Sequence, residues 1–337
     1  MRKKYFVSRN RFIVIIVVLS LIVLALGLLV NVASAVPVIS ATKVDHLIVD
    51  NDGDGVADPG DTIRYTVVVT NSGTMNASNV GFADAIDANT TLVAGSIKTT
   101  PIARHDIYAS LGNVGITVPA PGVLVNDNDP DGGSVSVIAD AGGTANGGAF
   151  SIGSDGAFSY LPPTGFEGTD SFNYLIQDAD FNQDRATVYV SVTEMIWFIN
   201  NSASSSGGGG ITAPFNSISA FNAIQTGTAP GAKDGDIVFL YSGSGNYNNG
   251  IVLRNGQTLI GQGAASSIAD ITGITVPTHS NTLPTTGGTR PTITTASGDG
   301  VLLGLNNQLQ GFDIGNTAGV GISDNGGTVG TLTVNEV

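Results

Sequence analysis

The sequence contains no cysteine, three histidines, one tryptophan and about half as many basic as acidic residues. The lack of cysteine excludes disulfides and thiolate metal sites along all 337 residues. His46, His105 and His279 lie far apart, without the paired spacing of a zinc site, and we interpret them as surface or turn residues. The sequence also lacks a G-x-S-x-G nucleophile motif and a G-x-x-x-x-G-K phosphate-binding loop. We therefore expect a protein that is not an enzyme.

Positive charge is scarce, because 13 Lys and Arg residues stand against 27 Asp and Glu residues, a formal net charge of −14. Five of the basic residues precede Phe12, so the rest of the chain has 8 basic and 27 acidic residues, a net charge of −19. A surface this acidic repels phosphate groups, which argues against binding to nucleic acid or to anionic membranes. The 46 glycines and the low charged fraction of 12% favour strands and turns over helices.

The first 35 residues have the pattern of an export signal. A basic start is followed by an apolar run from Phe12 to about Val32 and by the small-residue exit Ala33-Ser34-Ala35. The apolar run is also long enough to span a bilayer as a helix. Residues 1–35 are therefore interpreted as a signal peptide or a membrane anchor, and the anchor would be the chain's only contact with a membrane. Both alternatives predict a secreted or cell-surface protein.

A possible calcium loop occupies residues 50–61. Aspartates stand at positions 1, 3, 5, 9 and 12 of this twelve-residue stretch, with glycine at position 6. Calcium-binding loops take ligands from these positions and a carbonyl from position 7, although position 12 is usually the longer glutamate. Residues 62–70 alternate like a strand, so a helix-loop-helix is not expected, and a plain Asp/Gly turn is the alternative. The ligands predicted here are Asp50, Asp52, Asp54, Val56, Asp58 and Asp61.

The densest cluster of carboxylates and amides lies at 126–131, before short alternating runs that are separated by Gly and Pro. Such a cluster of oxygen atoms is typical of a site for a hard cation, and the runs predict strands of a sandwich. Two pairs of alternating aromatic residues, at 158/160 and 172/174, predict packing between two sheets rather than stacking against sugars.

Two segments resemble known modules of bacterial surface proteins. The pattern GDTIRYTVVVTNSG, followed by NVGFADAI and TLVAGS, resembles a short immunoglobulin-like repeat. This resemblance implies an antiparallel sandwich at 41–101, used as a spacer or display unit, without catalytic residues. Within 103–193, the pieces GVLVND, DPDG, GAFSY and GFEGTDSFNY resemble the cadherin-like repeats of large secreted adhesins.

The second resemblance implies a β-sandwich at 103–193 that binds calcium beside the cluster at 126–131. The run of acidic residues from 178 to 184 could contribute to this site or form a solvated turn, and the two alternatives are equally supported. Calcium between such modules would stiffen an array by replacing charge repulsion with coordination. The ligands implied are Asn126, Asp127, Asp129 and Asp131, with Asp106 or Asp178 and Asp180 nearby.

Residues 195–337 predict stacked short strands. Residues 196–199 form an apolar strand that needs a partner further along the chain, 204–210 a surface loop, and 235–241 another buried strand. A short helix is expected after Pro214. The segment 250–261 matches 300–311 at a constant offset of 50 residues, and such short apolar strands must stack as rungs to be buried.

The pattern of this third segment resembles the start of a right-handed parallel β-helix of the pectin-lyase type, with the short helix as a cap. The chain ends directly after the strand at 331–334, so we expect a truncated β-helix and a longer natural protein. The fold class predicted for the whole chain is all-β: an N-terminal signal helix, two immunoglobulin- or cadherin-like sandwiches and the β-helix.

Two functions fit these features. The first is a secreted or cell-surface structural and adhesive protein, whose calcium-stiffened modules display the β-helix to a glycan or protein of unknown identity. The second is a carbohydrate-active enzyme or carbohydrate binder, whose catalytic coils would follow Val337. The fold analogy supports the second function only weakly, because the same solenoid also serves proteins without catalytic activity.

Overall fold

The computed structural model describes residues 36–337 except residues 74, 76, 78, 79 and 325. The predicted signal or anchor segment, residues 1–35, lies outside the described residues. In the described part of the chain, strands dominate and the helices are short, so the prediction of an all-β fold is confirmed. None of the helices described is long and apolar enough to cross a membrane. The chain divides into two compact units, one ending at Thr91 and the other beginning at Leu92.

The first unit is built on an antiparallel hairpin of strands β1 (Ile39–Val49) and β2 (Thr62–Asn71), with the acidic segment 50–61 as its loop. Valine, isoleucine and threonine favour the extended backbone here. The described residues of 72–101 add no strand to it, and the hairpin's side chains are exposed or half-buried. The described part of 41–101 therefore shows one hairpin, and the complete sandwich at 41–101 stays a prediction.

The second unit begins with a two-layer sandwich. One layer has the order β4-β8-β7-β6, and the other contains β5, β9, β10 and β3, with β3 and β10 parallel and the remaining pairs antiparallel. A short 3-10 helix (Gly122–Val125) precedes the second acidic cluster. The strands are β3 (Asp106–Gly112), β4 (Ile116–Val118), β5 (Ser136–Val137), β6 (Asp140–Gly143), β7 (Ala149–Ile152), β8 (Phe158–Leu161), β9 (Gly168–Gln177) and β10 (Gln183–Ile199).

The core of this sandwich lies between the two layers, where the alternating aromatic residues meet. Phe158, Tyr160, Phe172 and Tyr174 are each at most 4% exposed. The Phe158 and Phe172 rings pack edge to face with centroids 5.6 Å apart, which is a favourable geometry for aromatic pairs. The prediction that these residues pack between two sheets is confirmed.

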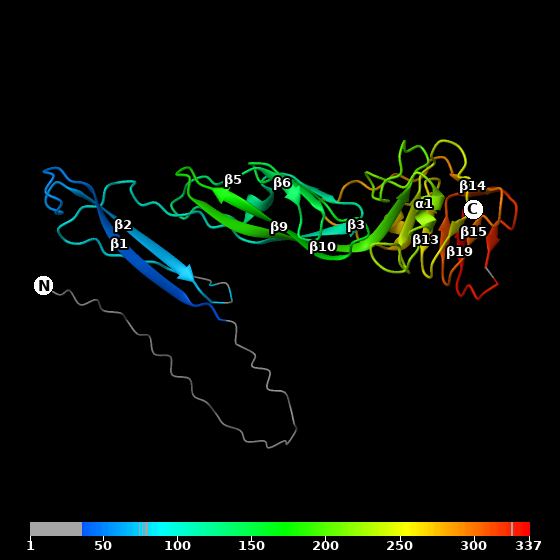
Figure 1. The fold of residues 1–337 in the computed structure, drawn as a ribbon, viewed down its shortest axis with the longest axis horizontal. Helices are drawn as coiled ribbons and strands as arrows, with labels where there is room; N and C mark the ends of the chain where they lie inside the picture. Colours follow the sequence, from blue (N-terminus) through cyan, green and yellow to red (C-terminus); the bar gives the residue numbers. More distant parts are fainter. Residues whose placement is uncertain (1–35, 74, 76, 78–79, 325) are drawn as a thin grey trace, which may run out of the picture. The chain divides into compact units, whose positions relative to one another are not determined.

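Strand β10 does not end with the sandwich. Its 17 residues run on into a parallel sheet, and its last four residues pair with β11 from Ile196↔Ile237 to Ile199↔Leu240. Figure 1 shows this strand as one continuous ribbon that starts between β9 and β3 and leads to the parallel strands. Glu194, where the sequence analysis placed a domain border, is a bulge in this strand with a φ of 56°. The border is therefore not a linker.

Residues 195–337, here called the coil region, contain three groups of parallel strands. The longest group has the order β10-β11-β13-β16-β19, and the others are β12-β15-β18 and β14-β17. The pairs Ile251↔Val301 and Thr258↔Gln308 have the offset of 50 residues that the sequence repeat predicts. The strands are β11 (Ile237–Leu240), β12 (Ile251–Val252), β13 (Thr258–Gly261), β14 (Thr292–Thr295), β15 (Val301–Leu302), β16 (Gln308–Gln310), β17 (Asp313–Thr317), β18 (Ile322–Ser323) and β19 (Thr333–Asn335).

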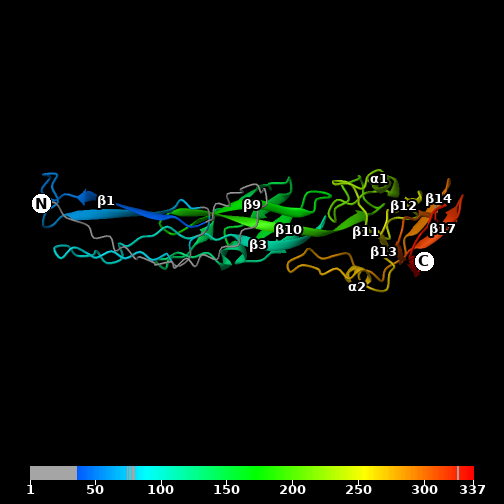
Figure 2. The ribbon, with the colours of Figure 1, turned by 90° about the horizontal axis from the view of Figure 1, so that it is seen from below.

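The longest parallel sheet is buried on both faces, which explains its continuous apolar runs. Trp197 and Ile199 belong to a core cluster enclosed by the three groups of strands, whereas Ile196 and Phe198 belong to a second cluster on the opposite face. Two five-residue helices cover the coil region from different sides, α1 (Ile218–Asn222) and α2 (Ile268–Thr272), as Figure 2 shows. Helix α1 is capped by the Ser217 hydroxyl, so it begins later than expected from Pro214.

Candidate calcium centres

The loop between β1 and β2 brings three of its predicted ligands together. The carboxylates of Asp50, Asp52 and Asp54 each offer an oxygen atom within 4.8 Å of the others, and all three are exposed. Tight turns produce this arrangement, because Asp50 accepts hydrogen bonds from the backbone N–H groups of Gly53 and Gly55. These two donors, Gly55 first, lower the pKa of Asp50 below its ordinary value, so its carboxylate stays charged and available to a cation.

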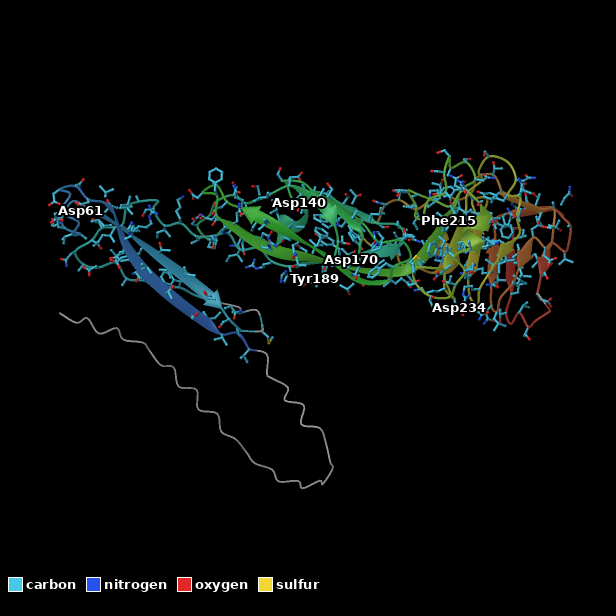
Figure 3. All side chains as sticks on the ribbon, viewed as in Figure 1. Asp61, Asp140, Asp170, Tyr189, Phe215 and Asp234 are labelled. Carbon is cyan, nitrogen blue, oxygen red and sulfur yellow. The ribbon has the colours of Figure 1, made fainter. Side chains whose placement is uncertain are left out.

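The other predicted ligands of this loop take different positions. The Asp61 carboxylate accepts hydrogen bonds from the backbone N–H groups of Asn51, at 2.9 Å, and Asp58, at 3.1 Å. It therefore ties the end of the loop to its beginning, and Figure 3 labels it there. Asp58 and Val56 lie in the same loop but do not belong to the close group of carboxylates. Asp50, Asp52 and Asp54 are thus the part of this loop best placed to hold a metal ion.

The second candidate centre is built around the hydroxyl of Tyr174 on β9. This oxygen lies 3.0 Å from Asp106 Oδ2, 3.1 Å from Asp127 Oδ2 and 2.8 Å from the carbonyl oxygen of Arg104. Asp106 is the first residue of β3, and Asp127 follows the 3-10 helix. The sandwich topology thus brings two acidic residues that are 21 positions apart in the sequence onto one buried hydroxyl.

The Tyr174 hydroxyl has one proton, which is fewer than the oxygen acceptors around it. Burial and the two carboxylates raise the pKa of Tyr174, so its hydroxyl keeps one proton and can donate to one acceptor at a time. Burial raises the pKa of Asp106 to about 6, against hydrogen bonds from Tyr174 and Asn126 that lower it. Burial also raises the pKa of Asp127, although the Arg104 backbone N–H lowers it in part. Two carboxylates therefore approach each other in a site where their charge is poorly compensated.

An amide oxygen beside these carboxylates has no partner. Asn126 donates from Nδ2 to Asp106 Oδ1 at 3.2 Å and to the His105 carbonyl, while its Oδ1 atom is buried without a hydrogen bond. A buried acceptor without a donor costs about 1–3 kcal/mol, unless a water molecule or a cation satisfies it. Calcium prefers this set of carboxylate and amide oxygens, so Asp106, Asn126 and Asp127 fit a calcium ion. Asn126 and Asp127 were predicted with Asp129 and Asp131, and Asp106 as one of two alternatives beside them; the structure places Asp106, not Asp178, next to Asn126.

Three other predicted ligands, Asp129, Asp131 and Asp180, lie around a lysine. Lys98 pairs with Asp180 at 2.8 Å, and the charges of Asp180, Asp131 and Asp129 contribute to raising the pKa of Lys98. Asp129 and Asp131 accept hydrogen bonds from the hydroxyl and the backbone N–H of Thr99. These carboxylates therefore have a cation and backbone donors within the chain.

Asp178 is the most buried of these acidic residues, at 5% exposure. It accepts hydrogen bonds from the backbone N–H groups of Asp180 and Asn182 and from the Asn182 side chain. This pattern is an Asx turn, which shapes the connection between β9 and β10. The structure thus favours the turn interpretation of the run from 178 to 184.

Sequence reasoning missed Tyr174 and Lys98 as members of these sites. Tyr174 was assigned to the core, and it does pack there, but its alternation with Phe172 gives no sign that its hydroxyl reaches two aspartates. Lys98 is far in sequence from Asp180, and only the folding of the chain brings them together. The isolated position of Lys98, as the first basic residue after Arg64, was the only available signal.

Replacing Lys98 with glutamine is expected to leave the midpoint of urea unfolding almost unchanged, because its ion pair with Asp180 is exposed and screened by water. Urea unfolding at low and high salt would measure the change. A clear fall in the midpoint would show that Lys98 holds the acidic turn together. The variant would then be a structural defect, unsuited to testing metal binding.

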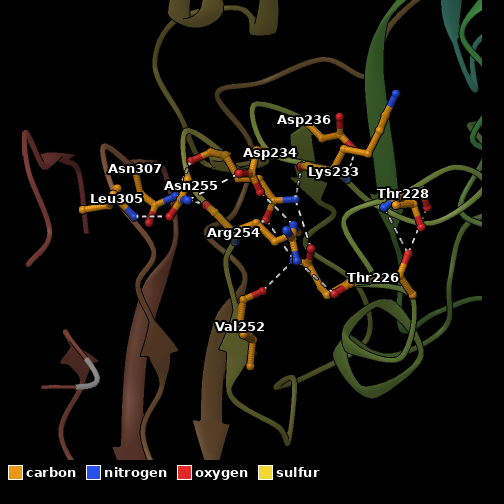
Figure 4. A network of polar contacts seen from close by, with 12 residues as sticks. Thr226, Thr228, Lys233, Asp234, Asp236, Val252, Arg254, Asn255, Leu305 and Asn307 are labelled. Atoms are coloured by element: carbon orange, nitrogen blue, oxygen red, sulfur yellow. Dashed lines mark hydrogen bonds and ion pairs between the residues drawn. The ribbon is translucent and has the colours of Figure 1, made fainter. Parts of the chain in front are cut away.

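Two acidic residues of the coil region, Asp234 and Asp313, connect neighbouring segments of its parallel strands. Arg254 Nε donates to Asp234 Oδ1 at 2.8 Å, and the Asn255 side chain donates to Asp234 Oδ2. The Asn255 side chain also accepts a hydrogen bond from the backbone of Leu305 on the following coil, and Figure 4 shows this network. Asp313 pairs with Arg290 in the same way. These contacts tie successive coils to each other through their turns.

Comparison with known proteins bears on the sandwich. No curated protein and no solved structure matched the chain in these searches. Residues 98–194 match the family model of the bacterial cadherin-like domain, close to the boundaries 103–193 expected from the sequence. Domains of this kind commonly bind calcium and commonly occur on or outside cells. The group formed by Asp106, Asn126, Asp127 and Tyr174 therefore lies inside a segment with the sequence features of a bacterial cadherin-like domain.

Proposed function

We propose that this is a secreted or cell-surface protein with a structural and adhesive role. Its cadherin-like sandwich and its β1–β2 loop bind calcium, and its coil region presents a surface to a partner. The observation that most supports this proposal is the group at Tyr174, where one hydroxyl proton faces a buried carboxylate, Asp106, and a half-buried one, Asp127, beside an amide oxygen without a donor. A divalent cation would compensate this charge and satisfy the free oxygen.

The role proposed for the coil region is display. Its in-register parallel strands, with a closed apolar core between three groups of strands, support the interpretation as a right-handed parallel β-helix. Such a solenoid offers long, regular and rigid faces. A glycan or protein on another surface is the partner that we propose, and the proposed role involves no catalysis.

Calcium is expected to stabilise the sandwich by mass action, because the ligands come together only in the folded state. At a calcium concentration about 100 times the dissociation constant, the gain in unfolding free energy is about 2.7 kcal/mol. Thermal unfolding with millimolar calcium and with chelator measures the gain. The variant Asp127→Asn should lose most of it, since it removes one of the two carboxylates at Tyr174.

The matched control is Asp129→Asn, which changes a neighbouring aspartate that faces Thr99 instead of Tyr174. It should keep the calcium response. A third variant, Asp52→Asn, tests the β1–β2 loop, and calcium titration calorimetry should show a lower number of bound ions. If neither Asp127→Asn nor Asp52→Asn alters calcium binding, both acidic groups are turns, and the proposal of a calcium-bound adhesive module fails.

A further inference from the structure

The sandwich and the coil region share more than one strand. Asn113, at the end of β3, is 2% exposed and has a φ of 65°, a conformation that Asn tolerates better than most residues. Its Nδ2 atom donates to the Ile196 carbonyl at 3.1 Å, and its Oδ1 atom accepts from the Gly165 N–H at 2.9 Å. Its own carbonyl accepts from the Ile211 N–H at 2.9 Å. One buried residue of the sandwich thus holds β10 and two loops.

One of these loops closes the open edge of the first parallel strand. The backbone N–H of Phe198 donates to the Gly209 carbonyl at 2.9 Å. The backbone N–H of Phe215 donates to the Phe198 carbonyl, also at 2.9 Å. The opposite edge of this part of β10 pairs with β11. The segment 207–215 therefore occupies the position that a preceding coil would take. It is positioned there by the hydrogen bond from Ile211 to Asn113 of the sandwich.

The outer face of the parallel sheet is also covered in part by the sandwich. Leu111 and Val114 of the sandwich are fully buried in the same cluster as Phe198, Phe239 and Ile260 of the first three parallel strands. A mixed cluster of this kind cannot form if the two parts fold without each other. Its apolar surface would be exposed to water on both sides.

A loop of the coil region reaches back to β4 and completes the contact. Thr117 donates its backbone N–H to the His279 carbonyl at 2.8 Å, and Asn281 donates to the Gly115 carbonyl at 3.0 Å. The Thr117 hydroxyl adds a hydrogen bond of 2.8 Å to the Asn281 side chain. The loop therefore pairs with a sandwich strand across 164 residues of sequence.

We propose that the cadherin-like sandwich has a second function as the N-terminal cap of the coil region, and that direct contacts hold this cap in place without calcium. Among the described residues, the charged side chains at this contact are already paired: Lys233 with Glu167, and Asp236 with Trp197 Nε1 and the Lys233 N–H. Sandwich and coils then open as one cooperative unit, and the orientation of the coils on the sandwich is fixed.

Hydrogen exchange on the full chain, followed by mass spectrometry, tests this proposal because it reports the opening of each segment separately. Asn113→Gly keeps the backbone conformation available and removes both amide hydrogen bonds. Exchange in β11 and β13, which Asn113 does not touch, should become roughly tenfold to a hundredfold faster, the loss expected for two buried hydrogen bonds. Exchange in β3 should accelerate by a similar factor.

The control is Phe181→Ala, because this ring in the β9–β10 turn is 79% exposed and its loss should leave exchange in β11 and β13 within about twofold. If Asn113→Gly does not fold, Thr117→Val weakens the same contact more gently, and about threefold faster exchange is expected at 258–261. If exchange becomes faster only in β3 and its loops, the proposal that the sandwich caps the coil region is wrong. It is also wrong if exchange in the coil region changes only when chelator is present. Calcium is not needed for the expected result, so the test is separate from that of calcium binding.

Discussion

Replacing Trp197 with alanine is expected to lower the free energy of unfolding by about 4 kcal/mol or more, the largest loss that we predict for a single side chain. Trp197 is 1% exposed in the apolar cluster of the coil region, and its ring stacks on Phe215 with centroids 6.0 Å apart. Other members of the cluster, among them Phe215 and Phe221, are themselves buried and closely packed, so they would fill the gap only in part and a cavity would remain. Removal of a large buried ring costs about 3–5 kcal/mol for lost contacts and the cavity.

A polar effect adds to this loss. Trp197 Nε1 donates to Asp236 Oδ2 at 2.8 Å, and Asp236 is itself 6% exposed. Burial raises the pKa of Asp236, while the N–H groups of Lys233 and Trp197 lower it in part. Without the indole, this buried carboxylate keeps the Lys233 N–H at 2.7 Å as its neutral donor. A buried group that loses a hydrogen-bond partner costs about 1–3 kcal/mol.

The two contributions can be separated by variants. Trp197→Phe retains most of the ring and removes the donor, so a loss of about 1–3 kcal/mol is expected. Phe181→Ala is the control, because this ring is 79% exposed, and a change within about 0.5 kcal/mol is expected. Urea unfolding should be followed by circular dichroism, since Trp197 is the chain's only tryptophan. Equal losses for the phenylalanine and alanine variants would mean that the cavity contributes little.

The strands of the coil region could be predicted because their apolar runs are continuous. Residues 196–199 needed a later partner, and β11, inside the buried strand expected at 235–241, supplies it. The repeat of 50 residues also translates directly into the register of two strand pairs. Continuous apolar runs and an internal repeat are properties of the sequence itself, so they are visible before the fold is known.

The contacts between distant segments could not be predicted in the same way. The sequence around Asn113 does not indicate that its side chain makes two hydrogen bonds to other segments. The sequence around Asn281 predicts only an ordinary polar loop. The border predicted at Glu194 falls on a bulge through which β10 continues, and a change of composition gives no sign of this continuity. Pairings over a hundred residues depend on the complete fold.

The predicted calcium ligands show the same difference between local patterns and contacts of distant segments. Asp50, Asp52 and Asp54 lie close in sequence, and the structure brings them together. The cluster at 126–131 is also local, yet the fold directs Asn126 and Asp127 to Tyr174 and directs Asp129 and Asp131 to Lys98 and Thr99. The local sequence shows where oxygen ligands are concentrated along the chain. The strand register decides which of them share one site.

The second large effect is expected at Asp106, where one substitution should change stability in opposite directions with and without calcium. The folded-state pKa of Asp106 is about 6, against an ordinary value of 3.8. The folded chain thus binds a proton that the unfolded chain has lost over this range, so the contribution of Asp106 to stability without calcium is greatest below about pH 4 and is lost as the pH rises through 6. The ionised carboxylate, 8% exposed, then costs about 2–3 kcal/mol at pH 7.

Asp106→Asn removes this cost: its oxygen accepts from Asn126 Nδ2, while its amide group faces the Tyr174 oxygen and leaves the Tyr174 proton to Asp127. With chelator at pH 7, the variant is therefore expected to be about 2 kcal/mol more stable than the unchanged protein, and at pH 4 the difference should vanish. With calcium the order should reverse, because the unchanged protein gains about 2.7 kcal/mol at 100 times the dissociation constant and the variant gains little.

Urea unfolding at pH 4 and 7, with calcium and with chelator, gives the comparison directly. Asp155→Asn is the control, because Asp155 lies in an exposed turn where it accepts a hydrogen bond from Ala157, and neither its stability nor its calcium response should change. If Asp106→Asn is less stable than the unchanged protein with chelator at pH 7, the carboxylate is already satisfied by the donors around it. Charge at the Tyr174 site would then need no cation, and the main physical support for calcium in the sandwich would be lost.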